Sequence, residues 1–162
     1  MSTLNIIYYT GTGNTEEMAK YIGEGAESAG SNVKLINVEE ADENAIDADF
    51  IAFGSPAVGA EEIAPEMVEF FEGIKDKIIG KTVGLFGSYD WGQGGWMETW
   101  REEIINEGLS VVNDGLIIHL AVDDDEKIEM VFIRCCIIGS TGYAGTVAFR
   151  REGRSKYCLG EV

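Results

Sequence analysis

The sequence predicts an α/β domain in which helices cover both faces of a parallel sheet. Apolar, strand-like runs alternate with segments of helical spacing along most of the chain. The strand-like runs are continuously apolar, as expected for strands that are buried on both faces. The length of 162 residues and the hydrophobic content of 45% suit one domain with a full core. Together these three observations indicate one α/β unit.

The first predicted elements form a strand, a tight turn and a helix. Leu4–Tyr9 is a short run rich in β-branched and aromatic residues, and it stops at a glycine-rich turn, which predicts a buried strand. From Thr15 to about Gly30, apolar residues recur at helical spacing among charged ones, which predicts an amphipathic helix. The next predicted elements are strands at Asn32–Val38 and Ala48–Gly54, with room for a short helix at Glu39–Asp47 between them.

The second half of the domain repeats this alternation. Pro65 suits the first turn of a helix, and the apolar residues that follow it up to Ile74 have helical spacing. The remaining predicted elements are a buried strand at Thr82–Tyr89, a helix at Trp96–Glu107 and a last strand at Leu109–Ala121.

Three unusual loops each follow a predicted strand. They are Thr10–Thr15, Ser55–Glu62 and Ser88–Gly95. In open α/β sheets, ligands bind at the carboxyl ends of the strands, beside the point where the strand order reverses. We therefore expect the three loops to converge on one binding site.

The loop Thr10–Thr15 has the composition of a phosphate site. Its glycines allow close backbone approach, and a helix N-terminus supplies N–H donors and the positive end of the helix dipole. The loop has no lysine, which excludes a Walker P-loop, and Glu16 breaks the G-x-G-x-x-G pattern of dinucleotide folds. A monophosphate is the better fit, and a plain turn with a helix cap stays the alternative. The donors are Thr10, Thr12, Asn14 and Thr15, with Gly11 and Gly13 between them.

The other two loops are less distinctive when each is taken alone. Ser55–Glu62 is a small-residue turn with two carboxylates at its end, typical of an ordinary loop. In Ser88–Gly95, aromatic residues stand in a glycine-rich frame. We expect Trp96, just after it, to anchor a helix, whereas Trp91, flanked by Asp90 and Gly92, does not fit a core.

The charge balance points to the kind of partner. The chain has 29 acidic and 12 basic side chains and a net charge of −17, which disfavours binding to nucleic acid or to an anionic membrane. It favours a partner with a basic docking face.

Other features of the sequence bear on location and metal binding. No apolar stretch is long enough to span a bilayer, no signal core follows the N-terminus, and the three cysteines form no C-x-x-C pair. We expect a cytoplasmic protein without a metal site.

Together the loops resemble those of flavodoxins of the short-chain type found in anaerobic bacteria. The resemblance covers about residues 4–126 and rests on TGTGNTE after the first strand, SPAVGAEE after the third and GLFGSYDWGQGGWM across the fourth. It implies a flavodoxin-like open parallel five-stranded sheet with strand order 2-1-3-4-5, helices on both faces, and flavin mononucleotide (FMN) at the switch point.

The resemblance also implies roles for individual residues. The phosphate would be wrapped by Thr10, Gly11, Thr12, Gly13, Asn14 and Thr15. Val58 and Trp91 would cover the two faces of the isoalloxazine ring, and Glu61 would accept a hydrogen bond from its N3. The carbonyl of Gly59 would lie near N5. The remaining cofactor-binding residues would be Pro56 and Ala57 beside Val58, and Ser88, Tyr89, Asp90 and Gly92 at the pyrimidine edge.

The implied function is a low-potential one-electron carrier, with no catalytic residues. Its partners would be redox enzymes with basic docking faces, such as flavodoxin or ferredoxin reductases and oxidoreductases. The alternative is an NAD(P)H-dependent FMN reductase or quinone reductase, although no second nucleotide motif is present. A phosphoacceptor regulator of the same topology would need an acidic cluster where the chain has Tyr8-Tyr9-Thr10.

The chain departs from the family pattern in two loop residues and in its tail. Val58 stands where relatives often have methionine, and Asp90 where they often have glycine.

We predict an FMN-binding domain at 1–129 and an atypical tail at 130–162, with the last helix altered. Residues 1–129 carry 27 acidic and 7 basic side chains, and residues 130–162 carry 2 and 5. We expect a monomer, with the tail as a possible route to self-association, and a structural role for His119.

Overall fold

The computed structural model describes residues 2–112 and 114–123 of the chain. Its main strands and helices lie close to the segments that the sequence predicts. In chain order they are β1 (Thr3–Tyr8), α1 (Asn14–Ser28), β2 (Asn32–Asn37), β3 (Phe50–Gly54), β4 (Ala57–Val58), β5 (Glu62–Ile63), α2 (Pro65–Ile74), β6 (Thr82–Tyr89), α3 (Gly95–Asn106), β7 (Ser110–Val111) and β8 (Leu116–His119). The predicted tail at 130–162 lies outside the described residues.

The main sheet is parallel and has the order β2-β1-β3-β6-β7, with β8 also pairing with β6. This confirms the expected flavodoxin-like order. The predicted last strand is divided into two: β7 pairs with the start of β6 and β8 pairs with its end. Between them the chain turns at Gly115, whose φ is +84°, and a Cβ there would meet Met97 Sδ at 2.6 Å. Asp and Gly favour such turns, and the close approach of Met97 to Gly115 also requires a residue without a side chain there.

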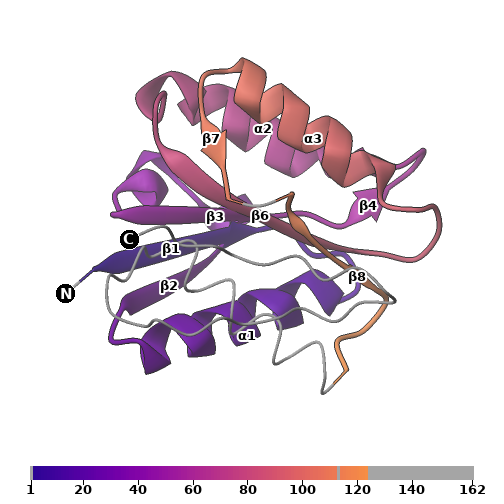
Figure 1. Cartoon of the computed structure of the whole chain (residues 1–162), viewed down its shortest axis with the longest axis horizontal. Helices are drawn as coiled ribbons and strands as arrows, with labels where there is room; N and C mark the ends of the chain where they lie inside the picture. Colours follow the sequence, from indigo (N-terminus) through magenta and orange to yellow (C-terminus); the bar gives the residue numbers. More distant parts are fainter. Residues whose placement is uncertain (1, 113, 124–162) are drawn as a thin grey trace, which may run out of the picture.

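Helices cover the two faces of the sheet in different numbers (Figure 1). Among the described helices, α1 lies on one face, and α2 and α3 lie on the other. Successive residues of β1 point to opposite faces, so Ile6 packs with Met18 of α1, whereas Ile7 belongs to the cluster that contains Met67 of α2 and Trp96 of α3. Each face thus has its own apolar core.

The crossover between β2 and β3 lacks an α-helix. It contains two 3-10 turns, η1 (Val38–Glu40) and η2 (Glu43–Ile46). The side chain of Asn37 accepts a hydrogen bond from Glu39 N at 3.0 Å, and that of Asp42 accepts one from Asn44 N at 2.9 Å. Such local bonds compete with helix propagation over a short segment. The predicted short helix is therefore present only as two separate turns.

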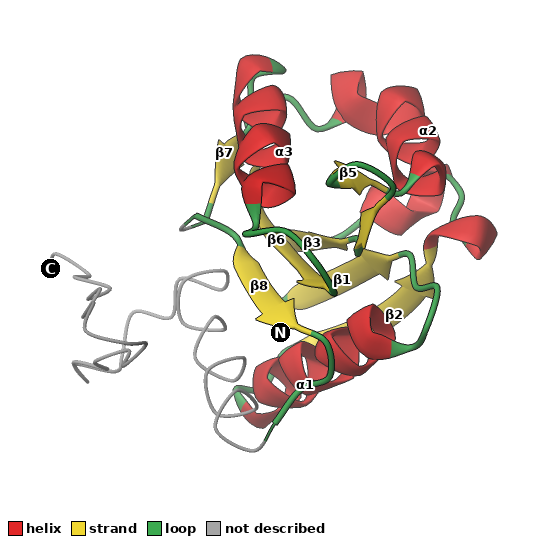
Figure 2. Cartoon of the chain, turned by 90° about the vertical axis from the view of Figure 1, so that its right-hand side faces the viewer, coloured by secondary structure: helices red, strands yellow, loops and turns green. Residues whose placement is uncertain are grey.

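The three loops that the sequence singles out all lie at the carboxyl edge of the sheet. Figure 2 looks onto this edge, where α1 begins and β8 ends. No helix in the described part of the chain is long and apolar enough to cross a membrane.

Candidate flavin site at the carboxyl edge of the sheet

The first loop leaves the start of α1 open to a ligand. Gly13 has a φ of +95°, and its N–H donates to Thr10 Oγ1 at 3.0 Å, which curls the loop back on itself. No side chain of the described residues caps α1. A Cβ built on Gly11 or on Gly13 would meet nothing within 4 Å. The first N–H groups of the helix therefore have no side-chain acceptor, and Thr10 can still donate its own hydroxyl hydrogen.

A cleft of 410 Å³ continues from this loop along α1. Lys20 lies in its wall, and its Nζ pairs with Glu16 Oε1 at 3.1 Å. The hydrogen bond from Lys20 to Glu16 raises the pKa of Lys20, so this cation stays protonated and paired with its neighbour. The residues that line the cleft are Thr12, Gly13, Asn14, Glu17, Lys20, Tyr21 and Glu24.

A buried hydrogen bond joins the first loop to the third. Thr15 and Ser88 are 1% and 4% exposed, and their hydroxyl oxygens are 2.9 Å apart. Thr15 opens α1 and Ser88 lies near the end of β6, so the pair fixes the helix start against the sheet. If Ser88 donates, the hydroxyl hydrogen of Thr15 is not used by this bond.

The second loop is a small hairpin between β4 and β5. Ser55 Oγ accepts from Ala64 N at 2.9 Å and donates to Pro56 O at 3.0 Å, which closes the base of the loop. Val58 is half-buried and pairs with Glu62 across the hairpin. At the tip, φ is +53° at Gly59 and +57° at Glu61.

The carboxylate of Glu61 connects the second loop to the third. Its Oε1 accepts a hydrogen bond from Gln93 N at 3.1 Å. A Cβ on Gly92 would overlap this carboxylate, so glycine is required there for the contact. The unusual backbone of Glu61 thus brings its side chain across the site, leaving further lone pairs of the carboxylate available.

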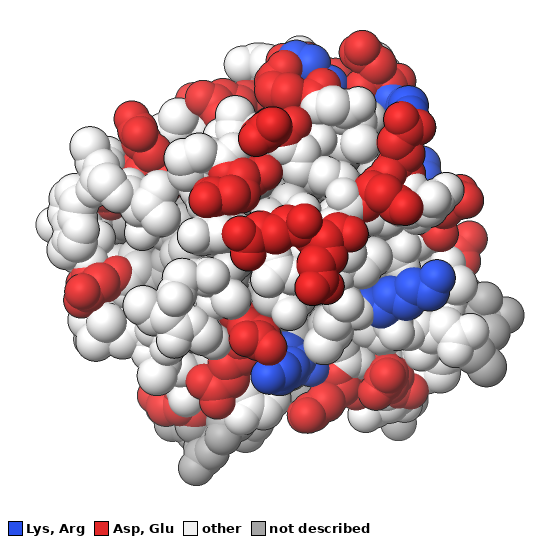
Figure 3. All heavy atoms as spheres, turned by 180° about the vertical axis from the view of Figure 1, so that it is seen from behind, with Lys and Arg blue, Asp and Glu red and all other residues white. Residues whose placement is uncertain are grey.

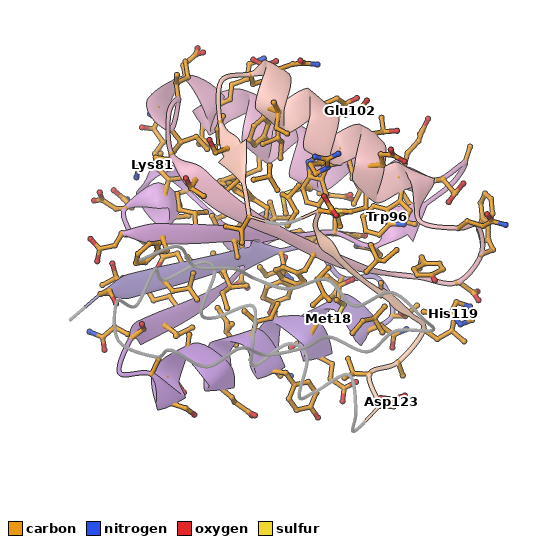
Figure 4. All side chains as sticks on the ribbon, in the orientation of Figure 1. Met18, Lys81, Trp96, Glu102, His119 and Asp123 are labelled. Carbon is orange, nitrogen blue, oxygen red and sulfur yellow. The ribbon has the colours of Figure 1, made fainter. Side chains whose placement is uncertain are left out.

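The third loop contains two tryptophans with opposite environments. Trp96 is 2% exposed and lies on Trp100 with 6.5 Å between ring centroids, which confirms it as a helix anchor (Figure 4). Trp91 is 58% exposed, and so it is not part of the core. Asp90 is exposed and is not among the described residues with positive φ, so the backbone does not demand glycine there.

Comparison with known proteins identifies the family. A family model described as flavodoxin matches residues 6–132. The chain is 39% identical over 116 residues to a flavodoxin of Megasphaera elsdenii, which corresponds to 70% of this chain and 85% of the relative. It is also 39% identical over 126 residues to a flavodoxin of Clostridium beijerinckii, covering 76% of this chain and 91% of the relative. The chain belongs to the flavodoxin family.

Solved structures of flavodoxins share the fold. The two-electron reduced Megasphaera elsdenii flavodoxin superposes with a TM-score of 0.71 at 37% identity, over 81% of this chain and 97% of that one. A flavodoxin from the domain Archaea superposes with a TM-score of 0.74 at 25% identity, over 82% of this chain and 93% of that one.

Membership of the flavodoxin family determines the cofactor and the class of function. Flavodoxins bind FMN and carry electrons, so the chain is an FMN-binding electron-transfer protein and not an enzyme. The expectation of a flavoprotein is confirmed, and a reductase is not favoured. FMN has a phosphate at one end and a flat aromatic ring at the other. The uncapped N-terminus of α1 suits the phosphate, and the exposed indole of Trp91 suits the ring.

Three residues near the site were not singled out as ligands from the sequence. Lys20 follows Glu16 at the helical spacing of an ion pair, and that signal was available. Gln93 contributes a backbone N–H, which no residue pattern reveals. His119 was expected to be structural; it contacts Tyr89 and Asp90 of the third loop because β8 pairs with the end of β6.

The flavodoxin site lies in an acidic protein. Burial raises the pKa of Tyr8, at the end of β1, and the nearby Glu16 raises it further. Among the described residues, no cluster of His, Cys, Asp and Glu side chains could hold a metal ion.

Proposed function

We propose that this chain is a low-potential one-electron carrier whose three loops at the carboxyl edge of the sheet hold FMN. The observation that carries the proposal is the pair of contacts that join the loops, Thr15 with Ser88 and Glu61 with Gln93. These contacts support one shared site formed by a phosphate-type loop, a carboxylate and an exposed indole. When bound, FMN supplies an aromatic ring that takes up and releases electrons one or two at a time.

The phosphate is assigned to the loop Thr10–Thr15. Backbone N–H groups at the start of α1 would donate to its oxygens, and the helix dipole would stabilise its negative charge. Side-chain donors would come from the threonines and Asn14. Lys20 is already paired with Glu16, so we assign the binding to neutral donors. The residues proposed for the phosphate are Thr10, Gly11, Thr12, Gly13, Asn14 and Thr15.

The ring is assigned to the other two loops. Val58 and Trp91 would form its two walls, and the carboxylate of Glu61 would accept a hydrogen bond from its edge. Gly59 lies at an exposed tip with φ of +53°, and glycine can exchange between backbone conformations at little cost, so its peptide can turn its carbonyl toward a new donor. The other residues proposed to line the ring are Pro56, Ala57, Ser88, Tyr89, Asp90 and Gly92.

The charge of the chain supports a low potential. The described residues near the site include Glu61, Glu62 and Asp90, and the chain as a whole has a net charge of −17. Adding negative charge to a ring held there is opposed by Coulomb repulsion. With the ring bound, Trp91 and Val58 would keep water from its two faces, and water would otherwise screen that repulsion.

Redox titration tests this proposal directly. We expect two separate one-electron steps for the FMN-loaded chain, because the carbonyl at Gly59 favours the first step and the acidic surroundings oppose the second. The visible spectrum is recorded at a series of fixed potentials. A single two-electron step would contradict the proposal, and rapid bleaching by NADH or NADPH alone would favour a reductase instead.

Removing the charge of Asp90 is expected to raise the second reduction potential. Asp90→Gly and Asp90→Asn both delete a carboxylate next to Trp91, and the expected increase is on the order of tens of millivolts. Asp47→Asn is the matched control, because Asp47 is an exposed carboxylate before β3, at the opposite edge of the sheet. An equal potential in wild type and Asp90→Asn would show that this carboxylate does not act on the ring.

We infer that the partners are redox enzymes with basic docking faces, including flavodoxin or ferredoxin reductases and oxidoreductases. On the face drawn in Figure 3, Asp and Glu side chains spread widely, and Lys and Arg side chains are few. Opposite charges on two proteins accelerate and orient their encounter. The exposed Glu62, Asp90 and Trp91 beside the site would lie within such a contact.

A further inference from the structure

The end of β8 makes two contacts with the third loop, one through normal strand pairing and one through the side chain of His119. β8 runs parallel to the end of β6, with His119 opposite Tyr89. Leu120 N donates to Tyr89 O at 2.8 Å, and His119 Nε2 lies 2.8 Å from Asp90 O. The strand therefore reaches the residue directly before Trp91. Figure 4 shows His119 at this end of the molecule.

The contact between His119 and Asp90 has a defined chemistry. A backbone carbonyl can only accept a hydrogen bond, so Nε2 of His119 must carry the hydrogen. The imidazole also packs against the ring of Tyr89, with 5.2 Å between centroids and an interplanar angle of 52°. The side chain is thus held by two different contacts, both to the third loop.

The third loop has few other attachments in this region. Ser88 is tied to Thr15, and Gln93 N is tied to Glu61. In the part of the chain that the structure describes, the hydrogen bond recorded for the segment 90–92 is the one from His119. Trp91 is 58% exposed, so its own side chain does not anchor the loop.

The backbone after His119 is unusual. Leu120 has φ of +61°, a left-handed conformation that leucine rarely adopts, although its side chain is 43% exposed. Backbone strain of this kind persists where surrounding contacts hold it, and it is common at ligand sites. Here the contacts are those from Leu120 N and His119 to the third loop.

We propose that His119 is a positioning residue of the flavin site, which holds the Asp90–Trp91 peptide so that the indole forms one wall for the ring. The proposal rests on the assignment of the ring to the second and third loops. Under this proposal His119 affects the binding of the cofactor without touching the cofactor.

The test compares three variants of the full chain: His119→Gln, His119→Asn and His119→Ala. Glutamine has an N–H donor as many bonds from Cβ as Nε2 of histidine, whereas the donor of asparagine is one bond nearer. Binding of FMN and of riboflavin is measured by the quenching of flavin fluorescence. Riboflavin lacks the phosphate, so its affinity reports on the ring site alone. Thermal unfolding confirms that each variant is folded.

We expect His119→Ala and His119→Asn to lower the affinity for FMN and for riboflavin by about three- to tenfold, which corresponds to the loss of one hydrogen bond. His119→Gln should restore affinity to within about twofold of wild type on the same scale. Unchanged affinity in His119→Ala would overturn the proposal, and so would a His119→Gln variant as weak as His119→Ala. Failure of the wild-type chain to bind either flavin would instead contradict the assignment of the site.

A spectroscopic measurement adds an independent criterion. His119 is the single histidine of the chain, so its ring proton resonances in an NMR spectrum need not be distinguished from those of another histidine. Adding riboflavin to the wild-type chain should shift these resonances, because the loop that the imidazole contacts becomes one wall of the bound ring. Resonances that stay unchanged at saturation would show that His119 is not coupled to the site.

Discussion

Trp91→Ala is expected to lower the affinity for FMN by about ten- to a hundredfold while leaving the free energy of unfolding within about 0.5 kcal/mol of wild type. The indole is 58% exposed, so its removal uncovers little buried surface. Stacking of a flat ring on an aromatic side chain contributes about 1–3 kcal/mol, which corresponds to the expected loss of affinity.

Trp96→Ala provides the matched contrast. Trp96 is 2% exposed, and truncation of a buried tryptophan costs about 3–5 kcal/mol of stability. Urea denaturation without flavin, together with fluorescence titration with FMN, separates the two effects. The assignment of Trp91 to the ring would be wrong if Trp91→Ala bound FMN as tightly as wild type. It would also be wrong if the loss of affinity matched a loss of stability.

Gly87→Ala is expected to destabilise the chain by about 3 kcal/mol or more. A Cβ at Gly87 would overlap the carbonyl oxygen of Ser55 and the ring of Trp96. Neither can move freely, because Ser55 Oγ closes the second loop by accepting from Ala64 N and Trp96 is buried against Trp100. Relief of the overlap would shift the second loop, so the affinity for FMN should also fall.

Gly73→Ala is the control for this substitution. Gly73 lies within α2, is exposed, and has open space around its Cβ position. Alanine is favoured over glycine inside a helix by about 0.5–1 kcal/mol, so this variant should be slightly more stable than wild type. Urea denaturation curves of the two variants give the comparison. Equal stability of Gly87→Ala and wild type would show that the loop accommodates a methyl group.

Most strands and helices could be predicted from the sequence because patterns of neighbouring residues determine them. β6 was predicted with its exact bounds, since the continuous apolar run Thr82–Tyr89 ends at a glycine-rich loop. The start of α2 at Pro65 follows from the preference of proline for a first helical turn. The split of the last strand and the two turns η1 and η2 were missed, because both depend on short side-chain and turn contacts that override an apolar pattern.

Within the candidate site, residue types were predictable and contacts were not. Trp91 and Trp96 are the same residue type five positions apart, and their neighbours in sequence indicated which one belongs to the core. The bonds of Thr15 to Ser88, Glu61 to Gln93 and His119 to Asp90 join residues that are distant in the chain. No spacing rule connects such residues, because their proximity depends on the order of the strands.

The sequence by itself determined the alternation of strands and helices, the glycine-rich loop without lysine and the strongly acidic character of this flavodoxin. Each of these is a property of neighbouring residues or of composition. The tertiary structure decided which donors lack a side-chain acceptor at the start of α1, how Glu61 reaches the third loop, and that His119 contacts Asp90. The physical reason is that parallel strands bring distant segments to one edge of the sheet, where hydrogen bonds form between residues that have no local relationship.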